Sequence, residues 1–113
     1  MILLLDDEPL ILMDLEFAVE DRGHRALCAT TCAQALQMIE RSSGVNVAVL
    51  DVSLKGETCV RVAHELDSRG IPYVLHSGDL DRQDETVARL GAPLVPKPAD
   101  SQRVIDAALN LAA

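Results

Sequence analysis

The chain has 113 residues, of which 49% are hydrophobic and only 2% aromatic, and its 18 acidic against 10 basic residues give a net charge of −8. This length suits one domain, residues 1–113, that builds an aliphatic core without disulfides. The negative charge repels a phosphate backbone and the scarcity of aromatic rings removes stacking platforms, so we expect no direct nucleic-acid binding.

The first third of the chain predicts two strands and two helices. Residues 2–5 form a continuous apolar run, typical of a buried strand. Pro9 is favourable in the first turn of a helix, and apolar residues follow at helical spacing until Gly23. Residues 25–29 are the weakest strand candidate. Thr31 is expected to cap the next helix, which ends near a Ser-Ser-Gly sequence.

The middle of the chain predicts two further strands around one helix. Residues 45–50 are apolar and rich in β-branched side chains except for Asn46, and the run stops at Asp51. Residues 53–57 are expected to form a loop. A helix with an apolar face then ends near Gly70, and residues 72–75 form another buried strand.

The last third predicts a helix, a strand and a final helix. Residues 81–90 form a polar helical stretch, and residues 93–95 a short strand. Ser101 is expected to cap the last helix, whose apolar residues share one face.

A strand therefore precedes a helix five times along the chain. Strands that are apolar on both faces indicate a parallel sheet covered by helices on each side. Right-handed crossovers leave few arrangements. We predict an α/β fold with a doubly wound, five-stranded parallel sheet in the order 2-1-3-4-5, which is flavodoxin-like. Ligands bind such sheets outside the carboxyl ends of the strands.

Acidic residues follow two strands that are neighbours in this order. Asp6, Asp7 and Glu8 come after the first strand, and Asp51 comes after the third. Carboxylates at close range repel one another. A hard divalent cation such as Mg²⁺ relieves that repulsion. An alternative stays open, in which the first group of acids only caps the first helix.

The same edge of the sheet offers a chemical role for Asp51. A carboxylate can attack phosphorus and form an acyl phosphate. Lys97 after the fifth strand would supply a cation, and Ser77 after the fourth a hydroxyl, to the phosphoryl oxygens. Each also has an ordinary interpretation, Lys97 as a solvated charge and Ser77 as a turn residue.

These residues together resemble the receiver domain of two-component response regulators. The matching signs are Asp6-Asp7-Glu8-Pro9, Asp51, Ser77-Gly78 and Lys97-Pro98, and the resemblance covers the whole chain. It implies the (βα)5 receiver fold and a cis peptide bond after Lys97.

The resemblance also implies a set of metal ligands and a reaction. Asp7 and Asp51 would bind Mg²⁺ directly, the backbone carbonyl of Ser53 would be a third ligand, and Asp6 would act more through water. Asp51 would take a phosphoryl group from a sensor histidine kinase or a histidine phosphotransfer protein. Lys97 and Ser77 would contact that group.

The implied function is a signalling switch rather than an enzyme. Phosphorylation would change binding to a downstream protein target, and the chain would be a monomer or weak dimer. Because 113 residues suffice for one receiver, we expect a stand-alone protein. The chain start lacks the basic region of a signal peptide and is interrupted by acids after five residues, which predicts a cytoplasmic location. The main alternative is a receiver cut from a hybrid histidine kinase or a larger regulator.

Two positions depart from the receiver pattern. Leu94 stands where family members carry an aromatic residue that turns inward on phosphorylation, and Lys55 stands where proline is common. A Mg²⁺-dependent aspartyl phosphatase is a rival class. It needs a second aspartate two residues after the nucleophile, where this chain has Ser53.

The remaining reactive residues are assigned to packing. The three cysteines lack the spacing of a zinc site and are interpreted as reduced thiols. His64 lies on a predicted helix, where it could carry a phosphoryl group if the chain were a histidine phosphotransfer module. Such modules are all-helical, and the predicted strands contradict that interpretation. A packing role is also the interpretation we favour for His76, although it precedes Ser77. No apolar run approaches the roughly 20 residues of a membrane span.

Overall fold

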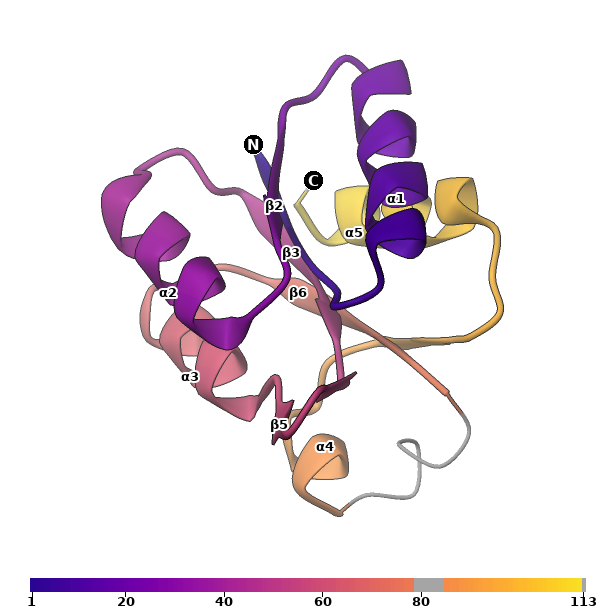
Figure 1. Cartoon of the computed structure of the whole chain (residues 1–113). Helices are drawn as coiled ribbons and strands as arrows, with labels where there is room; N and C mark the ends of the chain where they lie inside the picture. The colour runs from indigo at the N-terminus through magenta and orange to yellow at the C-terminus, as the bar shows by residue number, and fades with distance from the viewer. Residues whose placement is uncertain (79–84, 113) are drawn as a thin grey trace.

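The computed structural model describes residues 1–78 and 85–112. Strands and helices alternate along them except between the third strand and the third helix, where two short strands intervene (Figure 1). The elements are β1 (Ile2–Leu5), α1 (Pro9–Asp21), β2 (Ala26–Ala29), α2 (Cys32–Arg41), β3 (Val47–Asp51), β4 (Ser53–Leu54), β5 (Glu57–Thr58), α3 (Val60–Ser68), β6 (Tyr73–Ser77), α4 (Glu85–Arg89), β7 (Leu94–Pro96) and α5 (Ser101–Ala112).

The main sheet confirms the predicted topology. Its five parallel strands lie in the order β2-β1-β3-β6-β7. These are, respectively, the second, first, third, fourth and fifth predicted strands along the chain, so the order is 2-1-3-4-5. β1 and β3 pair directly, with Leu5 opposite Leu50. The residues that follow these two leucines therefore leave the sheet side by side.

Two hydrophobic clusters cover the two faces of the sheet. Leu3 and Leu5 point into the cluster under α2 and α3, whereas Ile2 and Leu4 point into the cluster under α1 and α5. Figure 1 shows these two pairs of helices on opposite sides of the sheet. All four strand residues are at most 1% exposed. Each such side chain contributes about 1.5–3 kcal/mol by burial, and both faces of a strand must be apolar to gain it.

Several helix ends follow the predicted signals. The Thr31 side chain accepts a hydrogen bond from the backbone N–H of Gln34 at 3.1 Å, so Thr31 caps α2 as predicted. Gly23 and Gly70 follow α1 and α3 with φ of 78° and 69°, a conformation that favours glycine. The peptide bond between Lys97 and Pro98 is cis, as the receiver resemblance implied.

The Thr31 cap gives a test of the local folding argument. We expect Thr31→Ala to lower the free energy of unfolding by about 1 kcal/mol, because an N–H at the start of α2 loses its acceptor. Urea unfolding of the variant measures this loss. The matched control is Ser43→Ala at an exposed turn position, which should change stability little. Equal effects of the two substitutions would contradict the capping role.

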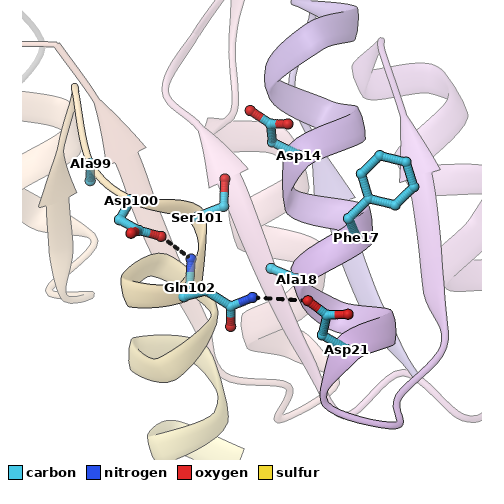
Figure 2. Close-up of a pocket in the computed structure, with 8 residues that line it drawn as sticks. All are labelled: Asp14, Phe17, Ala18, Asp21, Ala99, Asp100, Ser101 and Gln102. Carbon is cyan, nitrogen blue, oxygen red and sulfur yellow. Dashed lines mark hydrogen bonds between the residues drawn. The ribbon is translucent and has the colours of Figure 1, made fainter.

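Three local predictions were wrong or incomplete. Asp100, and not Ser101, caps α5, because its Oδ1 accepts from the backbone N–H of Gln102 at 2.8 Å (Figure 2). The expected loop at 53–57 contains an antiparallel hairpin, in which β4 pairs with β5. The first residues of the helix predicted at 81–90 lie outside the described residues, and α4 is described from Glu85.

The packing of α1 against α5 leaves a shallow hollow of about 400 Å³ between them (Figure 2). The Gln102 side chain donates to Asp21 across this gap at 3.3 Å, and Arg22 pairs with Asp106 beyond it. Phe17 lines the hollow from α1. The lining includes none of the residues predicted to carry the chemistry.

The structure also bears on the predictions made for the cysteines and for membrane spans. Among the described residues, Cys28, Cys32 and Cys59 form no disulfide, which agrees with their interpretation as reduced residues. Across residues 1–78 and 85–112, the helices are too short or too polar to cross a bilayer.

Candidate functional site

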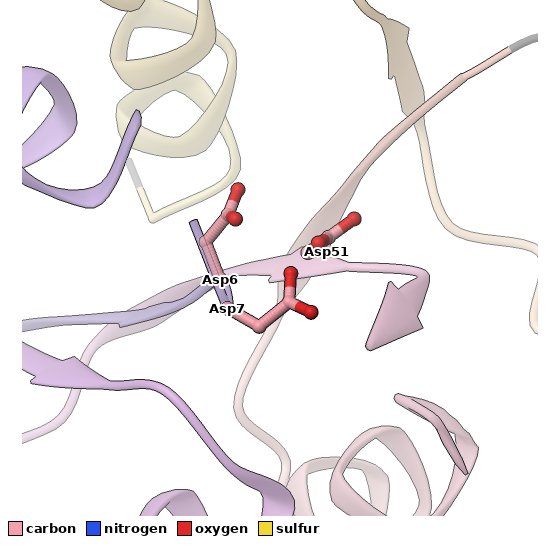
Figure 3. Close-up of side chains that lie close together, drawn as sticks. All are labelled: Asp6, Asp7 and Asp51. Atoms are coloured by element: carbon pink, nitrogen blue, oxygen red, sulfur yellow. The ribbon is translucent and has the colours of Figure 1, made fainter. Parts of the chain in front are cut away.

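The sheet brings three predicted carboxylates together at its carboxyl edge. Asp6 follows Leu5 and Asp51 follows Leu50, and these leucines are register partners. Asp7 is the next residue in the first loop. Each of the three aspartates offers an oxygen, and these oxygens lie within 4.8 Å of one another (Figure 3). The predicted convergence of residues far apart in the sequence is thus present.

The three aspartates differ in burial and in their hydrogen bonds. Asp6 is 1% exposed and Asp51 3% exposed, whereas Asp7 is half-buried. Asp6 Oδ1 accepts from the backbone N–H of Glu8 at 2.9 Å, and Asp7 Oδ2 from that of Lys55 at 3.0 Å. Both partners are loop or hairpin amides rather than amides inside the helix.

The helix-capping alternative therefore finds little support in this geometry. Glu8 occupies the position before α1, but in the described residues its side chain makes no capping hydrogen bond. The first turn of α1 contains no acidic residue. The acids instead face the ends of the neighbouring strands, where their mutual repulsion needs another source of compensation.

Lys97 supplies part of that compensation. It follows β7, and its Nζ lies 3.2 Å from Asp51 Oδ1 and 3.4 Å from Asp6 Oδ2. Its side chain is 20% exposed, so solvent screens these pairs only partly. The Lys97 backbone N–H donates to the Ser77 carbonyl at 2.7 Å, which joins the ends of β6 and β7. One cation thus faces two buried carboxylates, and the site keeps excess negative charge.

The charge balance is visible in the ionisation of Asp51. Burial raises its pKa from 3.8 to about 7, and the neighbouring Asp6 carboxylate adds to this rise. Lys97 opposes the shift without cancelling it. The same two aspartates raise the pKa of Lys97 despite its burial, so the ammonium stays charged. A further cation at this site would favour the ionised form of Asp51.

The end of β6 places two buried polar side chains beside the aspartates. Among the described residues, Ser77 Oγ and both ring nitrogens of His76 are buried without a hydrogen-bond partner. Burial, followed by the charge of Lys97, lowers the pKa of His76 to about 4, so the ring is neutral at pH 7. His76 is buried as expected, but its unpartnered nitrogens were not foreseen. Its position one residue before Ser77 was the only sequence signal.

The hairpin after Asp51 forms another wall of the site. Ser53 begins β4, two residues past Asp51, with an exposed side chain. On the far side, Glu57 Oε1 accepts from the backbone N–H of Cys32 at the start of α2, at 3.1 Å. Together with the bond from Lys55 to Asp7, this contact holds the hairpin between the first loop and α2.

Comparison with known proteins identifies the fold. No family model matches the chain, and no curated protein matches it. Among solved structures, SdrG from Sphingomonas melonis Fr1 is 34% identical, with a TM-score of 0.80, over 98% of this chain and 93% of that one. A response regulator receiver protein from Sinorhizobium medicae WSM419 is 27% identical over 98% and 92%, with a TM-score of 0.80. One from Pseudomonas putida reaches a TM-score of 0.84 over 97% and 94% at 19% identity, which shows the fold alone.

The sheet order and the acidic edge define a CheY-like, flavodoxin-type α/β protein. With the similarity to solved receivers over nearly its whole length, the chain belongs to the response regulator receiver domains. Its role is that of a signalling receiver.

Proposed function

We propose that the protein is a phosphoacceptor switch of a two-component phosphorelay, with Asp51 as the acceptor. The observation that carries this proposal is the cluster of Asp6, Asp7 and Asp51, whose oxygens lie within 4.8 Å of one another and face the Lys97 ammonium. Residues 1–113 would act as a single receiver domain. The phosphoryl donor would be a phosphohistidine on a sensor histidine kinase or a phosphotransfer protein.

The donor atoms at this edge fit Mg²⁺. All three side chains are carboxylates, which are hard oxygen ligands of the kind that Mg²⁺ prefers. The partial exposure of Asp7 leaves room for the waters that Mg²⁺ keeps. Asp6, Asp7, Asp51 and the backbone carbonyl of Ser53 would hold the ion. When bound, it would neutralise negative charge on the phosphoryl oxygens.

The proposed reaction moves one phosphoryl group between two side chains. An ionised Asp51 oxygen attacks phosphorus and forms a P–O bond, while the P–N bond of the donor's phosphohistidine breaks. The departing imidazole nitrogen keeps the electron pair of that bond. Lys97 and Ser77 donate hydrogen bonds to the phosphoryl oxygens, which gives the buried Ser77 hydroxyl the acceptor that it lacks in this structure.

The output of the switch would be altered binding to a downstream protein in the cytoplasm. Leu94 is half-buried on β7, where family members carry an aromatic residue that moves. The change in surface therefore has to be transmitted through other side chains near Ser77 and Lys97. A receiver segment of a longer hybrid kinase or regulator would use the same chemistry.

Labelling by a small phosphodonor tests the acceptor. With acetyl phosphate and Mg²⁺, the wild-type protein should gain the mass of one phosphoryl group, and Asp51→Asn should gain none, because the amide cannot act as the nucleophile. Intact-protein mass spectrometry measures both. Glu40→Gln, at an exposed position of α2 away from the site, is the matched control and should be labelled normally.

Two outcomes would refute the assignment. Normal labelling of Asp51→Asn would place the acceptor elsewhere. Release of many equivalents of phosphate per protein, with the acyl phosphate turning over rapidly, would favour the aspartyl phosphatase instead.

A further inference from the structure

The proposed chemistry leaves one buried polar side chain at the site without a role. His76 is 4% exposed, and neither ring nitrogen has a hydrogen-bond partner among the described residues. A buried polar group without a partner costs roughly 1–3 kcal/mol. The Ser77 hydroxyl, which is equally unpartnered, is accounted for by the phosphoryl group. An apolar residue at position 76 would pack without this cost, so the imidazole calls for a separate explanation.

The sheet register places His76 on the same face as the acceptor. His76 is the register partner of Asp51 on one side and of Val95 on the other. Register partners in parallel strands point to the same face. That face is the one covered by α1 and α5, because Val95 packs in their cluster. Lys97, two residues after Val95, approaches the same face and contacts Asp51.

His76 and Lys97 also share a cavity. It has a volume of about 190 Å³, and its walls include Ile11 from α1 and Pro98 and Ala99 from the turn before α5. Asp14 and Ser101 complete the lining. A space of this size lets a long lysine side chain leave Asp51. The Lys97 ammonium has three N–H donors, and its contacts with Asp51 and Asp6 use two of them.

We propose that His76 is a positioning residue that directs the Lys97 ammonium toward Asp51. The neutral imidazole offers one acceptor nitrogen from inside the cavity, directly or through a water molecule that the cavity can hold. This third interaction fixes the ammonium between the cavity and the carboxylates. His76 then acts on phosphoryl transfer through Lys97, without touching phosphorus itself. The inference rests on the proposed function of Asp51.

Two variants separate the ring nitrogens from the ring volume. His76→Phe keeps a planar ring of similar size but has no acceptor. His76→Gln keeps an amide oxygen that can accept from Lys97. With acetyl phosphate at saturating Mg²⁺, we expect His76→Phe to reduce the maximal labelling rate about tenfold, the loss of one hydrogen bond to a charged group. His76→Gln should stay within about threefold of wild type, because its amide oxygen can accept a hydrogen bond from Lys97.

A double-mutant cycle distinguishes positioning from a general packing defect. Lys97→Ala alone should slow labelling, and adding His76→Phe to it should cause no further loss, because the group that His76 positions is absent. The half-saturating Mg²⁺ concentration should be the same in wild type and His76→Phe. Thermal unfolding of His76→Phe should show a melting temperature close to that of the wild type, because the ring volume is kept, so that slower labelling does not reflect a folding defect.

The possible failures are distinguishable. If the wild type is not labelled at all, the proposed function fails. If the wild type is labelled and His76→Phe matches it, or if His76→Phe slows the Lys97→Ala protein as much as it slows the wild type, the positioning role is overturned while the phosphoacceptor proposal stands.

Discussion

At pH 8 and without divalent cations, Asp51→Asn is expected to raise the free energy of unfolding by about 2 kcal/mol. The folded protein holds the pKa of Asp51 at about 7, against an ordinary value of 3.8. A shift of this size corresponds to at most about 4 kcal/mol. This pKa already includes the attraction of Lys97, and rearrangement and water penetration around the ionised carboxylate reduce the expected gain below that limit.

The pH dependence of this effect has a definite sign. Between about pH 4 and pH 7 the folded state binds the Asp51 proton more tightly than the unfolded state does. Stability contributed by this proton is therefore present below about pH 4 and is lost as the pH rises through about 7. The advantage of Asp51→Asn should be near zero at pH 4, should grow through this window, and should level off above it.

Urea unfolding at several pH values in the presence of a chelator measures this effect. Glu40→Gln is the matched control, since it removes an exposed carboxylate from α2 and should leave the pH dependence of stability unchanged. Two results would show that ionised Asp51 does not destabilise the folded protein. One is an Asp51→Asn variant less stable than the wild type at pH 8, and the other is a stability difference that is the same at pH 4 and pH 8.

Millimolar Mg²⁺ is expected to raise the melting temperature of the wild-type protein. An ion that binds only the folded state at ten times its dissociation constant adds about 1.4 kcal/mol. For a domain near this size, each kcal/mol corresponds to roughly 4–8 °C. The effect should be larger at pH 8 than at pH 6, because Asp51 must lose its proton when the cation binds.

Scanning calorimetry with and without Mg²⁺ tests this expectation. Asp7→Ala should remove most of the shift, because a carboxylate of the cluster is lost. Glu40→Ala, which changes net charge equally at an exposed site on α2, should retain the shift. Equal shifts in both variants would indicate a general salt effect and would remove the metal site from the account.

The topology was predictable because each strand of the main sheet is a short apolar run. The fully buried β1 and β3 are apolar on both faces up to Leu5 and Leu50, and parallel sheets require this pattern. Because β1 and β3 are neighbours, their carboxyl ends place Asp6 beside Asp51. The location of the aspartate cluster could therefore be predicted from the order of the strands and from the positions of the aspartates directly after them.

The features that were missed depend on contacts between distant segments. The strands β4 and β5 of the hairpin have two residues each, which is too short for a periodic signal in the sequence. The hairpin is held by two hydrogen bonds, in which the backbone N–H of Cys32 donates to Glu57 and that of Lys55 donates to Asp7. Asp100 and Ser101 are both good capping residues, so sequence alone did not choose between them.

The raised pKa of Asp51 and the unpartnered ring nitrogens of His76 could not be predicted from the sequence either. Both arise from burial, from the distance to Lys97 and from the register of β3 with β6. No local sequence pattern fixes these quantities.

The most direct test of the central claim is a crystal structure of the protein grown with Mg²⁺ and beryllofluoride, a mimic of the phosphoryl group. The account predicts beryllofluoride attached to the Asp51 carboxylate, Mg²⁺ held by Asp7 and Asp51, and Lys97 and Ser77 in contact with the fluorine atoms. Beryllofluoride on another carboxylate, or an ion bound away from the aspartate cluster while Asp51 stays bare, would contradict it.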